Sequence, residues 1–363
     1  MQRSMKLVAI AAAVIVIVAA VGYAAYVSTL PSSTNDCAGV QTTVSGVAPA
    51  IRIASPSPVA LSPHASQAPE SHPSLLLHSG PRAASSGVIN VVAAENFWGS
   101  LVAQLGGNQT SVLSIVSDPN ADPHEYESNT SDAVAITNAQ FIIVNGVGYD
   151  DWALQLISAE STPGQVVLNV GQLTGVTVGG GVVSGNPHQW YNPIYVNTTV
   201  AAMYSDLVKI SPGEKSYFSQ NYAVLNSSLA QLYGEATSIK QHFAGTEVAA
   251  TEDIFVYLAN FTNLNLVSPP EFMEAVAEGD DPPAQSVVVF QCQLESGHVS
   301  VLVYNEQTVT PITANLKAIA SSHNVPIVGV TETIQPPDVT FQAWMYSQYL
   351  ALYNALNANA LGQ

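Results

Sequence analysis

Hydrophobic and polar residues alternate along residues 88–363 in a pattern typical of a parallel α/β protein. Short apolar runs predict strands, and longer stretches with apolar residues at every third or fourth position predict the helices between them. Eight strands are expected, near residues 89–94, 111–116, 140–145, 166–170, 247–250, 264–267, 299–304 and 326–330. The predicted fold class is therefore α/β with two lobes, each a four-stranded, mainly parallel sheet flanked by helices.

One long helix is predicted between the two lobes. Ser211-Pro212-Gly213-Glu214 has the spacing of a capping box, with proline at the first helical position. Apolar residues then recur at spacings of three and four from Tyr217 to about Gln241. A helix of roughly 28 residues rises about 42 Å. Residues 211–243 are therefore interpreted as a linking helix that joins the lobes rigidly.

The first 87 residues differ from the rest in composition. Two positively charged residues precede an uncharged apolar run from Leu7 to Val27, which as a helix is long enough to cross a bilayer. Residues 1–28 are interpreted as an N-terminal membrane anchor or a cleaved signal segment. Residues 29–87 are rich in Ser and Pro without an apolar period, which predicts an extended spacer. Both interpretations export the folded body to the extracellular side of the cell membrane.

Charge is scarce in this chain and mostly negative. The 363 residues include 8 Lys or Arg and 26 Asp or Glu, for a formal net charge of -18 at pH 7. So few positive charges cannot neutralise a run of phosphates, which excludes a generic nucleic-acid binder. A negative field instead raises the local concentration of cations. The low number of basic groups also limits self-repulsion in acid, so we expect the body to stay folded near pH 3, where carboxylates titrate.

Cysteines and glycosylation sequons add little to the fold prediction. Cys37 in the spacer and Cys292 in an apolar stretch do not make a disulfide framework, and we expect Cys292 to be simply packed. Sequons that could carry glycans on an exported chain stand at Asn108, Asn129, Asn197, Asn226 and Asn260.

Four residues that can bind a metal ion are each expected just past the carboxyl end of a strand, where open α/β sheets bind ligands. They are His124, His188, Glu252 and Glu332. Two imidazoles and two carboxylates make a closed ligand set for a divalent transition metal. Each histidine follows a proline, which stiffens the turn that aims the ring. The sequence contains no G-x-S-x-G or HExxH motif and no Cys–His nucleophile arrangement, so no catalytic residue is predicted.

Residues 88–357 resemble the substrate-binding proteins of zinc/manganese-type ABC transporters. Five segments carry the resemblance: Val91-Val92-Ala93 with its helix to Leu105-Gly106-Gly107, Asp122-Pro123-His124-Glu125-Tyr126-Glu127, Phe141-Ile142-Ile143-Val144-Asn145-Gly146, Asn186-Pro187-His188-Gln189-Trp190 and Glu252-Asp253-Ile254-Phe255-Val256-Tyr257. The resemblance implies an N-terminal metal-binding lobe at 88–210, the linking helix, and a C-terminal metal-binding lobe at 244–363. One metal ion is expected in the cleft between the lobes, as a transported ligand.

The same resemblance implies the ligands and the choice of metal. His124, His188 and Glu252 match the first three ligands of the family, and Glu332 matches the fourth, where the family often has Asp. Zinc-selective members usually have His in place of Glu252 and a His-rich loop, whereas residues 177–185 contain no His. Carboxylate is a harder ligand than imidazole, so Mn²⁺ is favoured, with Zn²⁺ and Fe²⁺ as alternatives.

The predicted function is the extracellular solute-binding component of an ABC transporter. Such a monomeric receptor would capture a divalent transition metal ion and deliver it to a permease in the membrane. Two alternatives remain open from the sequence. One is a metal-dependent hydrolase or oxygenase that uses the same His and Glu residues with an open coordination position. The other is a surface adhesin, for which the spacer and the sequons would suffice.

Overall fold

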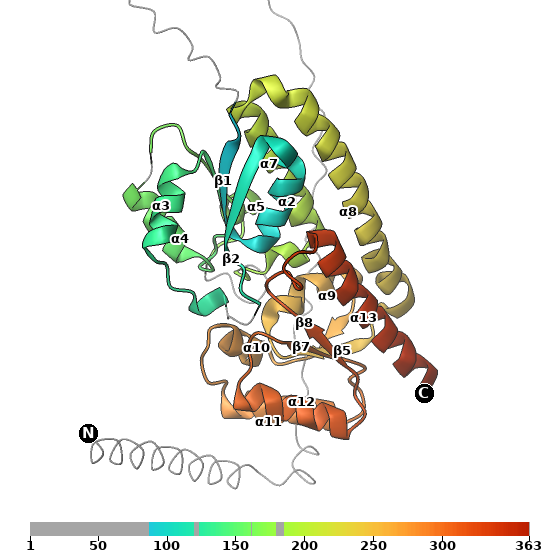
Figure 1. Ribbon diagram of the computed structural model, residues 1–363. Helices are drawn as coiled ribbons and strands as arrows, with labels where there is room; N and C mark the ends of the chain where they lie inside the picture. The colour runs from blue at the N-terminus through green and yellow to red at the C-terminus, as the bar shows by residue number, and fades with distance from the viewer. Residues whose placement is uncertain (1–86, 120–122, 161, 179–184, 363) are drawn as a thin grey trace, which may run out of the picture.

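The computed structural model describes residues 87–119, 123–160, 162–178 and 185–362. These residues form two lobes, each built on a four-stranded parallel sheet, and a long helix runs alongside both (Figure 1). The predicted α/β fold with two four-stranded sheets and a linking helix is confirmed. A strand forms at each of the eight places where the sequence predicts one.

The N-terminal lobe contains four parallel strands in the order β2-β1-β3-β4. The strands are β1 (Ile89–Glu95), β2 (Thr110–Val116), β3 (Phe141–Val144) and β4 (Val166–Asn169). The helices of this lobe are α2 (Asn96–Gly106), α3 (Thr130–Asn138), α4 (Asp151–Glu160), α5 (Val170–Thr174) and α7 (Pro193–Ile210). Val92 packs in a cluster with Ile136 of α3 and Ala153 of α4, while its neighbour Val91 belongs to the main core. Both sheet faces are therefore covered, which explains the nearly continuous apolar character of β1.

The C-terminal lobe repeats this strand order as β6-β5-β7-β8. The strands are β5 (Glu247–Ala250), β6 (Asn265–Leu266), β7 (Leu302–Asn305) and β8 (Ile327–Val330). The helices between them are α9 (Val256–Thr262), α10 (Pro270–Ala277), α11 (Ala284–Glu295) and α12 (Pro311–Ser322). Ala249 packs with residues of α10, α11 and α12, whereas Val248 and Ala250 belong to the main core. The third strands of the two sheets, β3 and β7, are thus equivalent in position.

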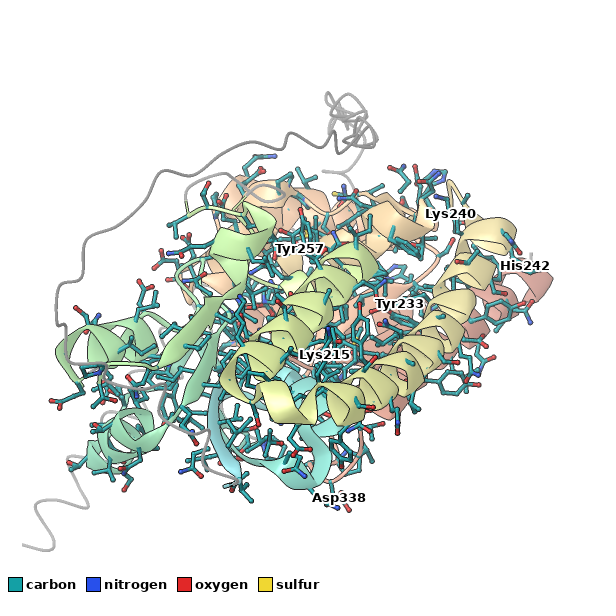
Figure 2. The ribbon with its side chains drawn as sticks, turned by 90° about the horizontal axis from the view of Figure 1, so that it is seen from above. Lys215, Tyr233, Lys240, His242, Tyr257 and Asp338 are labelled. Atoms are coloured by element: carbon teal, nitrogen blue, oxygen red, sulfur yellow. The ribbon has the colours of Figure 1, made fainter. Side chains whose placement is uncertain are left out.

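Two long helices, α8 (Lys215–Phe243) and α13 (Phe341–Gly362), lie side by side (Figure 1). α8 runs along both lobes, and α13 packs between α8 and β8 of the C-terminal lobe. Figure 2 shows Lys215 near one end of α8 and Lys240 and His242 near the other. The buried positions of α8 form one stripe at spacings of three, four and seven: Phe218, Leu225, Leu229, Leu232, Ala236, Ile239 and Phe243. This stripe belongs to a main core that includes residues of both lobes. The connection between the lobes is therefore packed along its whole length.

The predicted capping box at the start of α8 is wrong. Ser211 makes no side-chain cap bond, residues Pro212–Glu214 form one 3₁₀ turn (η5), and α8 begins at Lys215. The reason is that Ser211 ends α7, where its backbone N–H donates to the carbonyl oxygen of Leu207. At φ -132° and ψ 78°, Ser211 does not take the extended conformation that N-cap residues usually adopt.

The predicted N-terminal anchor and spacer lie outside the described residues, apart from Gly87. In the part of the chain that the structure describes, no helix has the length and hydropathy of a membrane-spanning segment.

Cys292 departs from its predicted role. It is half-buried in α11 and disulfide-bonded, where the sequence predicts a thiol that is simply packed. The other cysteine of the sequence, Cys37, lies outside the described residues. Bonded cysteines are typical of exported proteins, since the cytosol keeps thiols reduced.

Candidate metal centre

The structure brings His124, His188, Glu252 and Glu332 together where the two lobes meet. One ligand atom from each residue lies within 4.8 Å of the corresponding atoms of the other three. His188, Glu252 and Glu332 are fully buried, and the side chain of His124 is 21% exposed. Each lobe contributes two of these side chains. The arrangement gives two imidazole nitrogens and two carboxylate oxygens around one point, the donor set of a divalent transition metal site.

The two glutamates follow strands directly, but the two histidines do not. Glu252 comes just after β5, and Glu332 comes just after β8. His124 lies in a 3₁₀ turn, η3 (Pro123–Glu125), well beyond the end of β2, and His188 is separated from β4 by α5. The expectation that all four follow strand ends is therefore wrong for the histidines.

Glu332 lies at the centre of the cluster. Its Oε2 atom is 3.3 Å from Nε2 of His124 and 3.8 Å from Nε2 of His188. The hydroxyl of Tyr149 donates to the same oxygen at 2.7 Å. Tyr149 belongs to the N-terminal lobe and Glu332 to the C-terminal lobe, so this buried bond also joins the lobes.

The ring of His188 is held through its other nitrogen. Nδ1 lies 3.0 Å from Oδ1 of Asp253 and 2.9 Å from Oδ1 of Asn186. The Nδ2 atom of Asn186 also donates to the backbone carbonyl of Asp253 at 2.7 Å. These contacts fix the ring so that Nε2 faces Glu332. In many metal-binding histidines, a carboxylate bonded to the other ring nitrogen orients the ring in the same way. No sequence pattern predicts this role for Asn186 or Asp253, although both residues stand close to predicted ligands.

Burial and charge shift the pKa values of all four side chains. Burial would lower the pKa of His188, but Asp253 and Glu332 outweigh it and raise that pKa to about 10. Burial would likewise lower the pKa of His124, but the charge and hydrogen bond of Glu332 outweigh it and raise that pKa to about 8. Burial and the charge of Glu332 raise the pKa of Glu252 to about 8. Burial favours a high pKa for Glu332 as well, but the two imidazoles hold it well below its usual range. Without a metal, the cluster therefore retains protons at neutral pH.

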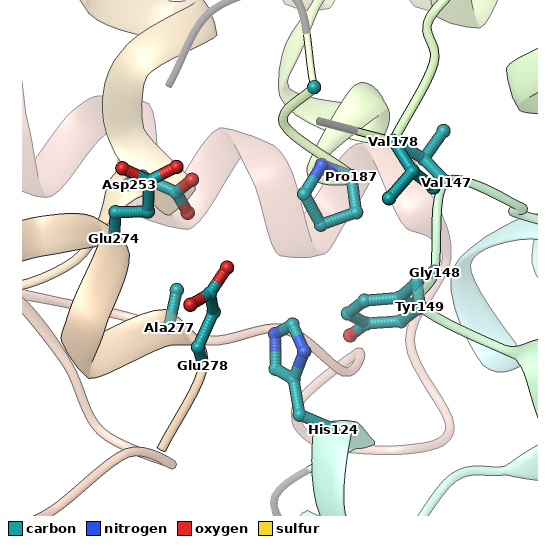
Figure 3. A pocket seen from close by; sticks show the side chains of 11 residues that line it. His124, Val147, Gly148, Tyr149, Val178, Pro187, Asp253, Glu274, Ala277 and Glu278 are labelled. Atoms are coloured by element: carbon teal, nitrogen blue, oxygen red, sulfur yellow. The ribbon is translucent and has the colours of Figure 1, made fainter. Parts of the chain in front are cut away.

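A pocket of about 340 Å³ lies beside the cluster and is lined by His124. Figure 3 shows the imidazole of His124 between Glu278 on one side and Tyr149 on the other. Asp253 and Glu274 line the same pocket from the C-terminal lobe. Three acidic side chains thus face the approach to the cluster, where a negative potential raises the local concentration of cations.

A second pair of buried acids lies in the N-terminal lobe, apart from the four-residue cluster. Glu95 ends β1, and Asp150 accepts hydrogen bonds from the backbone N–H groups of Asn145 at 2.6 Å and Gly146 at 2.7 Å. Both acids are fully buried. Burial, and then the neighbouring charge of Asp150, raise the pKa of Glu95 well above its usual range. Burial raises the pKa of Asp150 to about 6. The bonds to Asp150 fix the turn that carries Tyr149.

Comparison with curated proteins identifies metal-binding relatives at low identity. The chain is 26% identical over 144 residues to the "Manganese-binding lipoprotein MntA" of Halalkalibacterium halodurans, covering 40% of this chain and 47% of the relative. It is 25% identical over 194 residues to the "Iron ABC transporter substrate-binding lipoprotein MtsA" of Streptococcus pyogenes, covering 50% of this chain and 61% of the relative. The matched region thus spans less than two thirds of each of these relatives.

Solved structures show the same fold. The chain superposes on a crystal structure of ZnuA with a TM-score of 0.60 at 20% identity, covering 75% of this chain and 99% of that one. It superposes on the periplasmic zinc binding protein TroA from Treponema pallidum with a TM-score of 0.63 at 16% identity, covering 74% and 99%. A family model described as "ZnuA: Zinc-uptake complex component A periplasmic" matches residues 91–355, which include nearly all of both sheets and all four clustered side chains. The chain therefore belongs to the ZnuA family of zinc-uptake component A proteins.

Proposed function

We propose that the chain is the extracellular solute-binding component of an ABC transporter, which captures one divalent transition metal ion and delivers it to a membrane permease. The observation that carries the proposal is the cluster of four side chains whose ligand atoms lie within 4.8 Å of one another. His124, His188, Glu252 and Glu332 are the proposed ligands. Catalytic metal sites usually keep one position for water, so a closed set of four side chains supports capture over hydrolysis or oxygenation.

The chemistry of the ligands favours Mn²⁺, with Zn²⁺ and Fe²⁺ as alternatives. Two carboxylates make the site harder than a site of three histidines, which favours Mn²⁺ or Fe²⁺. The Irving–Williams order still gives Zn²⁺ higher affinity at most nitrogen and oxygen sites. Relatives carry names that refer to manganese, iron or zinc, so family membership alone does not choose among them.

Capture is proposed to exchange protons for the metal ion. The raised pKa values of His124, His188 and Glu252 mean that these groups hold protons that a metal must displace. Metal affinity should therefore fall as the pH falls through and below these pKa values, since each proton that the cluster binds competes with the ion. Each lobe supplies two ligands, so separation of the lobes on the permease would remove half of the coordination and release the ion.

The N-terminal segment is proposed to hold this receptor at the membrane. The apolar run from Leu7 to Val27 and the Ser- and Pro-rich spacer suit a tethered body on the extracellular side. The bonded state of Cys292 supports an oxidising compartment. The proposed partner is the permease of the transporter, and the receptor is proposed to act as a monomer.

Metal binding by the purified full chain tests the proposal. Isothermal titration with Mn²⁺ or Zn²⁺ should give about one ion per chain, and His124→Ala or Glu252→Ala should abolish binding, since each removes a proposed ligand. His242→Ala and Glu235→Ala are the matched controls, because both residues are exposed on α8. The controls should bind as the wild-type chain does. Unchanged stoichiometry and affinity in His124→Ala or Glu252→Ala would contradict the ligand assignment.

A further inference from the structure

We propose that Asn305 sets the coordination number of the captured ion by leaving each glutamate only one oxygen for the metal. The inference rests on the proposed function and names the residue that determines how the ion is held. Asn305 ends β7, the strand that lies between β5 and β8 in the sheet. Because Glu252 follows β5 and Glu332 follows β8, the Asn305 side chain lies between the two carboxylates.

The amide nitrogen of Asn305 contacts both carboxylates. Nδ2 donates to Oε2 of Glu252, and it donates to Oε1 of Glu332 at 2.7 Å. The hydroxyl oxygen of Thr308 lies 3.0 Å from the same nitrogen. An amide nitrogen has two hydrogens, and carboxylate oxygens accept more strongly than a hydroxyl does. Asn305 is 1% exposed, so these bonds form away from bulk water, where they are electrostatically strong.

The orientation of the amide is fixed by its other end. Oδ1 of Asn305 accepts the backbone N–H of Gln307 at 3.0 Å. A flipped amide would turn its oxygen toward two carboxylate oxygens and its nitrogen toward an N–H group, so every one of these contacts would become repulsive. The donor side of Asn305 therefore faces Glu252 and Glu332.

These bonds divide the four carboxylate oxygens into two that are bonded to Asn305 and two that are not. In Glu332, Oε1 is bonded to Asn305, while Oε2 faces the Nε2 atoms of both histidines. In Glu252, Oε2 is bonded to Asn305, while Oε1 is buried without a hydrogen-bond partner among the described residues. One oxygen from each glutamate and one nitrogen from each histidine give four protein ligands.

Four ligands suit the tetrahedral geometry of Zn²⁺, whereas Mn²⁺ commonly takes six oxygen-rich ligands. Asn305 therefore opposes the preference for Mn²⁺ that two carboxylates would otherwise give. Without the amide, either glutamate could bind through both oxygens and raise the coordination number. Asn305 touches the metal only through the glutamates and so acts as a positioning residue.

Cobalt provides the test, because Co²⁺ absorbs visible light strongly when four-coordinate and weakly when five- or six-coordinate. The full chain loaded with Co²⁺ should show the strong bands, and Asn305→Ala should show clearly weaker ones. Competition titration should shift the ratio of Mn²⁺ to Zn²⁺ affinity toward Mn²⁺ by about tenfold in Asn305→Ala, the lower end of effects for groups that orient metal ligands. Asn305→Ser keeps one donor and should fall between the two. Asn265→Ala, an exposed asparagine of the same lobe, should match the wild-type chain.

The outcomes separate this inference from the proposed function. A wild-type chain that binds one Co²⁺ with weak bands would overturn the inference alone, and this measurement needs no variant to fold. Folded Asn305→Ala or Asn305→Ser with unchanged bands and an unchanged affinity ratio would do the same. Failure of the wild-type chain to bind Mn²⁺, Zn²⁺ or Co²⁺ would overturn the proposed function and the inference with it.

Discussion

The two lobes share one strand order, and a buried asparagine stands at the equivalent place in each, yet the two asparagines support different kinds of group. Asn145 directly follows β3, and Asn305 ends β7, the third strand of each sheet. Asn145 donates to the backbone carbonyl of Pro187 at 2.9 Å, next to His188. Asn305 donates instead to the carboxylates of both glutamates. The N-terminal lobe thus fixes a loop, and the C-terminal lobe fixes side chains.

The difference follows from where the side chains of the cluster arise. A histidine at the end of a long connection needs two kinds of support. One set of bonds fixes the backbone of the loop, and a bond to Nδ1 fixes the orientation of the ring. The sheet already positions the backbone of a glutamate that lies just past a strand end. The remaining variable is which carboxylate oxygen is left for the metal. Equivalent positions in two similar lobes can therefore carry the same residue type for different reasons.

The largest effect should come from Glu332→Gln, because Oε2 of Glu332 faces both histidines and also accepts the Tyr149 bond. Loss of this charge should weaken Zn²⁺ and Mn²⁺ binding by more than about 100-fold. That loss is larger than the loss expected when a residue that only orients a metal ligand is removed. Competition against a metal indicator measures the affinity, with Glu235→Gln on exposed α8 as the control. An affinity within tenfold of the wild-type value would show that the lobes do not share Glu332 as their common ligand.

Asn145→Ala should have the next largest effect and should separate the two asparagines. It removes the acceptor of the Trp98 indole N–H, at 3.2 Å, and the donor to Pro187. We expect metal affinity to fall by about 10- to 100-fold and stability to fall by about 1–3 kcal/mol. The Co²⁺ band intensity should stay at the wild-type level, in contrast to Asn305→Ala. A loss of intensity in Asn145→Ala would mean that both asparagines control the coordination number.

The buried acids Glu95 and Asp150 predict a pH dependence of stability that belongs to the N-terminal lobe. The pKa of Asp150 is about 6 in the folded chain against 3.8 for the free group, and that of Glu95 is also raised. The folded state thus binds more protons than the unfolded state between these values, so the contribution of the pair to stability rises as the pH falls from 7 to 4. For Asp150 alone, the difference corresponds to about 3 kcal/mol.

Urea unfolding of the metal-free chain at pH 7 and pH 5 measures this effect. Glu95→Gln should be more stable than the wild-type chain at pH 7 and should gain less stability on acidification, since one of the two acids is gone. A wild-type chain whose gain on acidification equals that of Glu95→Gln would argue against a raised pKa for Glu95. The direction of this effect agrees with the expectation, from the scarcity of basic residues, that the body tolerates acid.

Thr308→Ala should have the smallest effect. It removes only one neutral acceptor of Asn305 and leaves both bonds to the glutamates. The expected cost is about 1 kcal/mol of stability, with metal affinity unchanged within a few-fold. A loss of affinity as large as that of Asn305→Ala, measured by the same competition titration, would mean that Thr308 and Asn305 position the carboxylates together.

The sequence predicts the fold well because the fold depends on local periodicity. The eight apolar runs and the stripe from Phe218 to Phe243 appear directly in the spacing of residues. The Pro-His turns likewise mark His124 and His188 as candidate metal ligands. The same local pattern fails at Ser211, because a capping signature cannot reveal the backbone conformation that this residue takes between α7 and η5.

The partners of the clustered residues could not be predicted in this way. Tyr149 and Glu332 stand 183 positions apart in the chain, and no spacing rule connects them. Asn305 looks like any polar residue at a strand end until the sheet order places β7 between β5 and β8. Such roles depend on which strands become neighbours, and that information is spread over the whole fold.

The most direct test of metal capture is a crystal structure of the full chain grown with Mn²⁺ or Zn²⁺, with the ion located by its anomalous scattering. We expect one strong peak among His124, His188, Glu252 and Glu332, bonded to both Nε2 atoms, to Oε1 of Glu252 and to Oε2 of Glu332. A peak elsewhere, or no peak at this cluster from protein that binds the metal in solution, would contradict the proposed site.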